Sequence, residues 1–110
     1  MSDHPLPTGK IPPELLAKVI SQAPLNDRRV LVGPGIGMDC AVIESGPDLL
    51  VVKTDPITFS TDLAGWYAVQ VNANDVATTG ATPRWFLLTS LLAEAATTPR
   101  LLEELSGQVF

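Results

Sequence analysis

The spacing of apolar residues predicts three helices along this chain. They cover residues 12–22 and 65–80 and a last stretch that begins at Pro99. In each stretch apolar side chains recur three or four positions apart, which places them on one face of a helix. Thr98 and Pro99 suit the start of the last helix, as its cap and its first helical residue.

Short apolar runs between these helices predict four strands, at residues 30–32, 40–44, 49–54 and 85–92. Gly46, Pro47 and Asp48 form a turn between the second and third runs, as in a hairpin. The order is therefore helix, three strands, helix, strand, helix. This order predicts an α+β fold, with a four-stranded mixed sheet and helices on one face.

The last run of the sheet, residues 84–92, is apolar at almost every position. Such continuous apolarity is typical of a strand that is covered on both faces. A domain of this size offers helices for one face. We therefore expect a second copy of the chain to cover the other face, through a large apolar twofold contact.

Length and composition limit the class of protein. The 110 residues suffice for one domain, predicted at residues 11–110 after a flexible, Pro-rich arm at residues 1–10. The net charge of -5 argues against a nucleic-acid surface, and no apolar run is long enough to cross a membrane. The chain has no secretory signal pattern. It ends on apolar residues, which suggests a domain cut from a longer protein whose C-terminal domain is absent here.

Cys40 is the one cysteine of the chain, so no internal disulfide can form. A reducing, cytoplasmic location is the corresponding expectation. No histidine or cationic residue lies near Cys40 in the sequence. We interpret Cys40 as a small strand residue rather than a nucleophile.

Three aspartates are the candidate metal ligands. Asp39 precedes the second strand, Asp55 follows the third, and Asp75 lies in the middle helix on one flank with Asn72 and Thr79. Facing strand ends would bring Asp39 and Asp55 to one edge of the sheet, with Asp75 across a cleft. Converging carboxylates without basic partners would repel unless a divalent ion such as Mg²⁺ joined them. The alternative is a helix cap, a turn residue and a surface charge.

A glycine-rich loop at residues 33–39 contains Gly33, Gly35 and Gly37. It lacks the Gly-Lys-Ser/Thr of a Walker loop and the spacing of a dinucleotide fingerprint, and a strand rather than a helix follows it. Two readings stay open for this loop. Its backbone amides approach a phosphate, or it is a tight connection between strands.

Three ordered motifs carry a family resemblance: GMDCAVI at residues 37–43, VVKTDPI at 51–57 and VNANDVATTGATPRW at 71–85. Together they resemble the N-terminal domain of the aminoimidazole ribonucleotide (AIR) synthase superfamily. That superfamily includes thiamine-monophosphate kinase, selenophosphate synthetase, formylglycinamidine ribonucleotide synthase and the hydrogenase-maturation dehydratase. The likeness is greatest to the AIR synthase-related and hydrogenase-maturation branch.

The resemblance implies an enzyme that uses ATP and Mg²⁺ to phosphorylate an amide-like or carbonyl oxygen of a small-molecule or protein-borne acceptor. It implies a homodimer in which the N-terminal domains pair their sheets, with ATP near the interface. By motif, Asp39, Asp55 and Asp75 would bind the metal. The nucleotide-binding residues would be Asn72, the loop glycines Gly33, Gly35 and Gly37, and Lys10 in the arm.

Two departures from the family pattern leave alternatives open. Met38 stands where several relatives carry a second acidic residue, and the family's second domain is missing. The chain is then a catalytically silent nucleotide-binding relative, or a dimerisation module. No catalytic residue is assigned, and the fragment by itself is expected to do no chemistry. The candidate cations are Lys10, Lys53 and Arg84, and none of these is in obvious register with the three aspartates.

Overall fold

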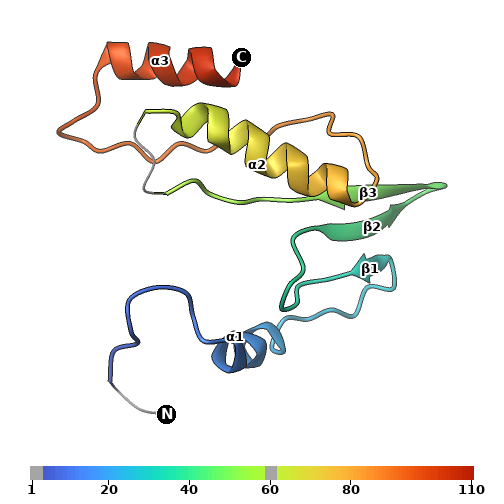
Figure 1. The fold of residues 1–110 in the computed structure, drawn as a ribbon. Helices are drawn as coiled ribbons and strands as arrows, with labels where there is room; N and C mark the ends of the chain where they lie inside the picture. Colours follow the sequence, from blue (N-terminus) through green and yellow to red (C-terminus); the bar gives the residue numbers. More distant parts are fainter. Residues whose placement is uncertain (1–3, 59–61) are drawn as a thin grey trace. The chain divides into compact units, whose positions relative to one another are not determined.

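A computed structural model describes residues 4–58 and 62–110, which fall into two compact units, Met1–Leu50 and Val51–Phe110. Residues 1–3 of the predicted arm lie outside the described residues, and so do residues 59–61 of the polar stretch before the second helix. Figure 1 shows the elements in chain order, and the two units are described separately below.

The first unit holds a short helix and a three-stranded sheet. Helix α1 covers Pro13–Ile20, and strands β1 (Val30–Val32), β2 (Ala41–Ser45) and β3 (Asp48–Val52) follow, with the last residues of β3 reaching the second unit. The strand order is β1-β2-β3, and the β1–β2 pair is antiparallel, with a bulge between the Val30–Ile43 and Val32–Val42 partners. Gly46 turns the β2–β3 hairpin at φ 62°, a conformation that glycine adopts readily.

The second unit holds two helices, α2 (Ala64–Thr78) and α3 (Pro99–Val109). The side chain of Thr98 accepts a hydrogen bond from the Leu101 amide at 3.1 Å, and Pro99 opens α3. The cap and first residue read from the sequence are therefore confirmed. All three predicted helices are present, with ends within a few residues of the prediction.

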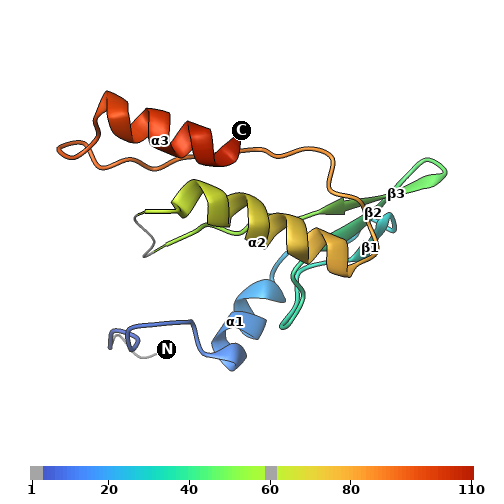
Figure 2. The same cartoon turned by 45° about the horizontal axis from the view of Figure 1, so that its top comes forward.

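Helix α3 lies beside the start of α2 in both views of the fold (Figures 1 and 2). The contact needs a glycine: a Cβ on Gly65 would stand 2.8 Å from the carbonyl oxygen of Leu105. Leu63 at the N-cap of α2 gives no side-chain hydrogen bond, and Gln108 of α3 takes over that role. Its Oε1 accepts from the Gly65 amide at 3.0 Å, and its Nε2 donates to the Asp62 carbonyl at 2.7 Å. One side chain from α3 thus caps α2.

The prediction of a fourth strand is wrong for the described chain. Residues 85–92 form no strand, and the sheet has three antiparallel strands rather than four in a mixed arrangement. No hydrogen bond joins residues 82–92 to another described residue. Apolar side chains signal a need for burial, but a strand also needs a neighbouring backbone to pair with, and the sequence pattern does not say whether the same chain provides it.

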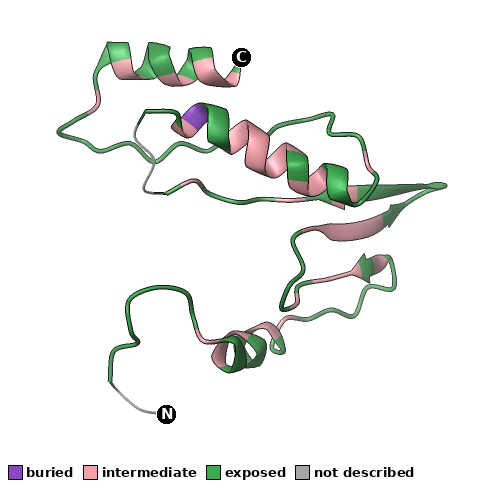
Figure 3. Ribbon diagram, viewed as in Figure 1, coloured by how far each residue is buried: buried purple, intermediate pink, exposed green. Residues whose placement is uncertain are grey.

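Burial is low throughout (Figure 3). No described hydrophobic side chain is fully buried, and Gly65 alone among the described residues falls in the buried class. Exposure is also high in the segment predicted as a strand, where Trp85 is 77% exposed, Leu87 91% and Leu91 95%. None of the described helices combines the length and apolarity needed to cross a membrane.

Candidate functional site

A lysine with a little-exposed side chain joins two of the predicted aspartates. The Nζ of Lys53 lies 2.5 Å from Oδ2 of Asp75 and 3.3 Å from Oδ2 of Asp55. The Lys53 side chain is 6% exposed, against 27% for Asp75 and 44% for Asp55. Lys53 and Asp55 follow directly on β3, and Asp75 lies on α2, so the ion pairs tie the segment after β3 to the helix. We call Lys53, Asp55 and Asp75 the charge cluster.

The sequence explains how these side chains meet. Lys53 and Asp55 are two positions apart, and residues two apart in an extended chain point to the same side. Asn72 and Asp75 are three positions apart on α2, so they share a face of the helix. The segment after β3 runs alongside α2 in Figures 1 and 2, in agreement with these contacts.

Asn72 fastens α2 to the same segment. Its Nδ2 donates to the carbonyl oxygen of Asp55 at 3.1 Å and to that of Ala68 at 2.8 Å. Two carbonyl acceptors on one atom identify that atom as the amide nitrogen, because an oxygen there would face both of them without a proton. The other atom, Oδ1, is buried and has no hydrogen-bond partner. A buried polar atom without a partner is unusual in a folded protein. Oδ1 therefore has unused capacity to accept a hydrogen bond or to ligate a cation.

The charge cluster changes the proton affinity of its lysine. Burial by itself lowers the pKa of Lys53, but the hydrogen bonds that its ammonium donates to Asp75 and Asp55, together with their negative charge, outweigh burial. The pKa of Lys53 therefore lies above its ordinary value, and the side chain is an ammonium at neutral pH. The two carboxylates thus hold a cation.

Lys53 is the residue that sequence reasoning missed. The expectation that the carboxylates lack basic partners and that no cation is in register with them is wrong for Asp55 and Asp75. The signal was present in VVKTDPI, where the lysine interrupts an apolar strand two positions before an aspartate. The contact with Asp75 spans 22 positions and depends on the placement of α2, which no local pattern reports.

Thr79, the third residue of the polar helix flank, has a different role. It is the C-cap of α2, where its hydroxyl donates to the Val76 carbonyl at 2.7 Å and accepts from the Ala81 amide at 3.3 Å. Thr79 thus closes the helix. Of the three flank residues, Asn72 and Asp75 lie against the segment after β3.

The other predicted site residues belong to the first unit. Asp39 is exposed and comes two residues before β2, and Lys10 is exposed in the arm before α1. In the glycine loop, Gly37 has φ 77° and requires glycine, and the Met38 amide donates to the Gly35 carbonyl at 3.2 Å. One backbone amide of the loop is therefore already hydrogen-bonded within the loop's own turn. Phosphate binding by the loop and by Lys10, and metal binding by Asp39, stay predictions.

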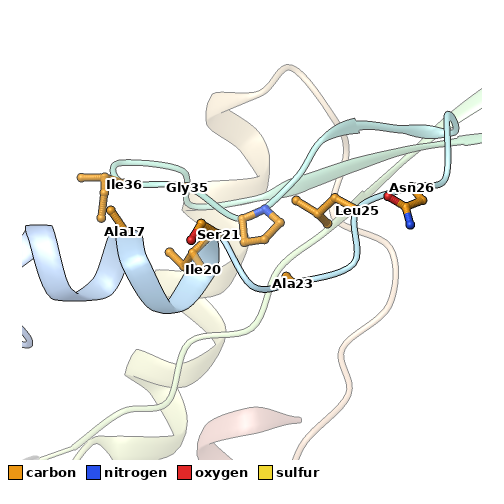
Figure 4. Close-up of a pocket in the computed structure, with 9 residues that line it drawn as sticks. Ala17, Ile20, Ser21, Ala23, Leu25, Asn26, Gly35 and Ile36 are labelled. Atoms are coloured by element: carbon orange, nitrogen blue, oxygen red, sulfur yellow. The ribbon is translucent and has the colours of Figure 1, made fainter. Parts of the chain in front are cut away.

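An open pocket of about 460 Å³ lies beside this loop within the first unit (Figure 4). Ala17 and Ile20 of α1 line one side, and Gly35 and Ile36 of the loop another. Ser21 and Asn26 bring polar side chains to the lining, and the rest is mainly apolar. The lining contains no charged residue, so the pocket by itself does not indicate a phosphate site.

The charge cluster fits a hard divalent ion that keeps other ligands. Within residues 4–58 and 62–110 no group of three His, Cys, Asp or Glu side chains could hold a metal ion. Asp55 and Asp75 supply two carboxylates, and Asn72, whose Nδ2 contacts the Asp55 backbone, carries a buried amide oxygen. Mg²⁺ is typically held by one or two carboxylates, with waters and substrate phosphates completing its octahedron. The donor set therefore suits Mg²⁺ that arrives with phosphate better than an ion held by protein alone.

Comparison with known families identifies the chain. It matches the family model described as AIR synthase related protein, N-terminal domain, over residues 37–109, more than half of its length. The chain belongs to this family, as its three motifs indicated. The matched region contains Asp39, the charge cluster and Asn72, and it leaves out Lys10, Gly33 and Gly35. Searches of curated proteins and of solved structures find no match.

Proposed function

We propose that the chain is the nucleotide-binding N-terminal domain of an enzyme that uses ATP and Mg²⁺ to phosphorylate an amide-like or carbonyl oxygen. Membership of the AIR synthase family supports the class of protein. The observation that carries the proposal is the pairing of Asp55 and Asp75 on one cation, together with the buried, unpartnered amide oxygen of Asn72, whose Nδ2 contacts the Asp55 backbone. Mg²⁺ in phosphate-transfer sites is typically held by one or two carboxylates together with substrate phosphates, and this pair would supply the carboxylates.

The residues of this chain would bind and orient rather than react. Asp55 and Asp75 would hold Mg²⁺, and Asn72 would fix the Asp55 backbone and present Oδ1. Bound there, the metal ion supplies neutralisation of the charge on the phosphate that is transferred. Phosphoryl transfer rests on such positioning and neutralisation, with little covalent help from the protein.

The 110-residue chain by itself is proposed to bind nucleotide without turnover. Its one cation at the two carboxylates, among the described residues, is Lys53, and both carboxylates already hold it. We propose that a further domain binds the acceptor, as the family resemblance implies. Phosphate release by the chain that disappears in Asp55→Asn would contradict this.

The test of nucleotide binding is a calorimetric titration with a non-hydrolysable ATP analogue and Mg²⁺. Asp75→Asn keeps the shape of the side chain and removes one carboxylate charge. We expect it to weaken binding by about tenfold to a hundredfold without unfolding α2, because one metal ligand loses its charge. Glu103→Gln, an exposed residue of α3 with the same change in charge, is the matched control. Equal affinities for the native chain and Asp75→Asn would contradict the metal site.

A second function, self-association, is proposed from residues 84–92. Trp85, Leu87 and Leu91 are largely exposed, and the backbone of residues 82–92 has no partner in the described chain. An apolar segment with unpaired backbone groups is suited to pairing with another strand. We propose that a second copy of the chain pairs with it, in a homodimer through the sheet. A chain that dimerises but does not bind nucleotide would be a dimerisation module. A chain that binds nucleotide but shows no turnover, even in a longer version of the protein, would be a catalytically silent relative.

A further inference from the structure

The ammonium of Lys53 contacts one oxygen of each carboxylate that a metal ion would use. Both Asp55 and Asp75 use Oδ2 to contact Nζ, and the lysine side chain is only 6% exposed. A Mg²⁺ ion binds carboxylate oxygens at about 2.0–2.1 Å, closer than any hydrogen bond. An ammonium and a divalent ion cannot both sit against the same two oxygens, because like charges at such a distance repel strongly. Metal binding through these two oxygens therefore requires Lys53 to move.

Displacing the ammonium is unfavourable unless it finds another anion. A buried charge that loses its partners retains the desolvation penalty without the compensating attraction. Free Mg²⁺ must also give up tightly held water to bind. A metal ion that carries a di- or triphosphate removes the first obstacle, because its phosphate oxygens offer the displaced ammonium a new partner. The four-carbon stem of lysine lets the head group reach a nearby oxygen while its backbone stays beside β3.

We propose that Lys53 is an internal counter-ion that makes the Asp55–Asp75 pair selective for metal bound to a polyphosphate over free metal ion. In the absence of ligand, Lys53 holds the two carboxylates together and competes with free divalent ions. When a metal–polyphosphate binds, the ammonium moves to a phosphate oxygen and the carboxylates contact the metal. This inference deepens the proposed function, on which it rests, by assigning Lys53 as the residue that couples metal binding to phosphate binding.

The test compares the native chain with Lys53→Met, which removes the charge and keeps a similar stem. The first probe is MnCl₂ without phosphate, measured by calorimetry and by the rise in melting temperature. We expect Lys53→Met to bind Mn²⁺ at least about tenfold more tightly than the native chain, since the competing cation is gone. The second probe is Mg²⁺ with inorganic pyrophosphate. Here Lys53→Met should bind at least about tenfold more weakly, because the contact between ammonium and phosphate is lost.

Two further variants keep the experiment decisive. Lys18→Met changes an exposed lysine of α1 and should leave both affinities unchanged. Lys53→Arg retains the charge and should keep weak Mn²⁺ binding. If Lys53→Met is poorly folded without metal, Mn²⁺ should restore its native circular dichroism, since the metal takes the place of the ammonium.

The outcomes separate this inference from the proposed function. Unchanged Mn²⁺ affinity in Lys53→Met, or pyrophosphate binding that is as tight as in the native chain, overturns the role of Lys53. A native chain that binds neither Mg²⁺–pyrophosphate nor Mg²⁺–ATP contradicts the proposed function. In that case the Mn²⁺ titration still decides whether Lys53 excludes free metal from the two carboxylates.

Discussion

The charge cluster and the segment at residues 84–92 both lie in the matched family region. The side chains of the cluster find their partners within the chain, whereas those of the segment remain exposed. The cluster closes within one unit: Lys53 is 6% exposed, and its charge is met by Asp55 and Asp75. The segment stays open: Leu87 is 91% exposed and Leu91 95%, and its backbone has no hydrogen-bond partner among the described residues.

The difference follows from the range of the forces involved. One ammonium is satisfied by two oxygens within hydrogen-bond distance, so a single helix beside a strand end is sufficient. Apolar side chains gain free energy in proportion to the area removed from water, about 25 cal/mol per Å², so they need a broad surface. The chain itself provides the two oxygens that Lys53 needs. We expect a second copy of the chain to provide the broad apolar surface that residues 84–92 need.

The largest expected effect comes from charging the open segment. Leu87→Asp together with Leu91→Asp should weaken self-association at least about a hundredfold, because burying each leucine is worth about 1.5–3 kcal/mol and a carboxylate cannot replace it. Analytical ultracentrifugation at tens of micromolar should show a dimer for the native chain and a monomer for the variant. Leu6→Asp, which changes an exposed leucine of the N-terminal arm, is the control and should remain a dimer. A monomeric native chain would contradict the expectation that a second copy covers residues 84–92.

An intermediate effect is expected at the contact that closes the second unit. Gly65→Ala should lower the free energy of unfolding by about 1–3 kcal/mol, because the added Cβ would stand 2.8 Å from a backbone oxygen that cannot easily move. Gly107→Ala is the matched control on α3, where a Cβ meets nothing within 4 Å. It should raise stability by about 0.5–1 kcal/mol, as alanine favours helix over glycine. Urea denaturation measures both, and equal effects would show that α2 and α3 do not pack closely.

The smallest effect on stability is expected at an exposed ion pair, which shows how much of the cluster depends on burial. Asp27 accepts hydrogen bonds from the side chain and amide of Arg29, and these lower its pKa from 3.8 to about 2. Because the folded pKa is depressed, any stabilisation by this carboxylate is present above pH 3.8 and is lost as the pH falls towards 2.

Arg29→Gln should return the pKa of Asp27 towards 3.8 in a carboxyl NMR titration. The melting temperature at neutral pH should hardly change, because exposed ion pairs contribute little to stability. Lys53→Met is the buried counterpart and should lower the melting temperature clearly. A large loss in Arg29→Gln would mean that ion pairs stabilise this chain whether or not they are buried.

The sequence predicts those residues of the candidate site that lie in its ordered motifs. Asp55, Asn72 and Asp75 stood out because poor helix formers and strand-end aspartates needed a reason. Their partner Lys53 did not, since a lysine within a strand run looks like an ordinary surface residue. The structure made Lys53 visible by bringing α2 to the segment after β3, a contact between residues that are distant in the sequence.

The sequence by itself determined the three helices, the cap at Thr98, the first three strands, the hairpin turn at Gly46 and the family. Each of these depends on spacing, on a local backbone conformation or on an ordered motif, all of which are written in neighbouring residues. Only the tertiary structure decided that Gln108 caps α2 and that Lys53 joins Asp55 to Asp75. It also decided that residues 85–92 form no strand within the described chain. These depend on which distant groups meet, because a hydrogen bond, an ion pair or a strand pairing exists only when its partner is in place.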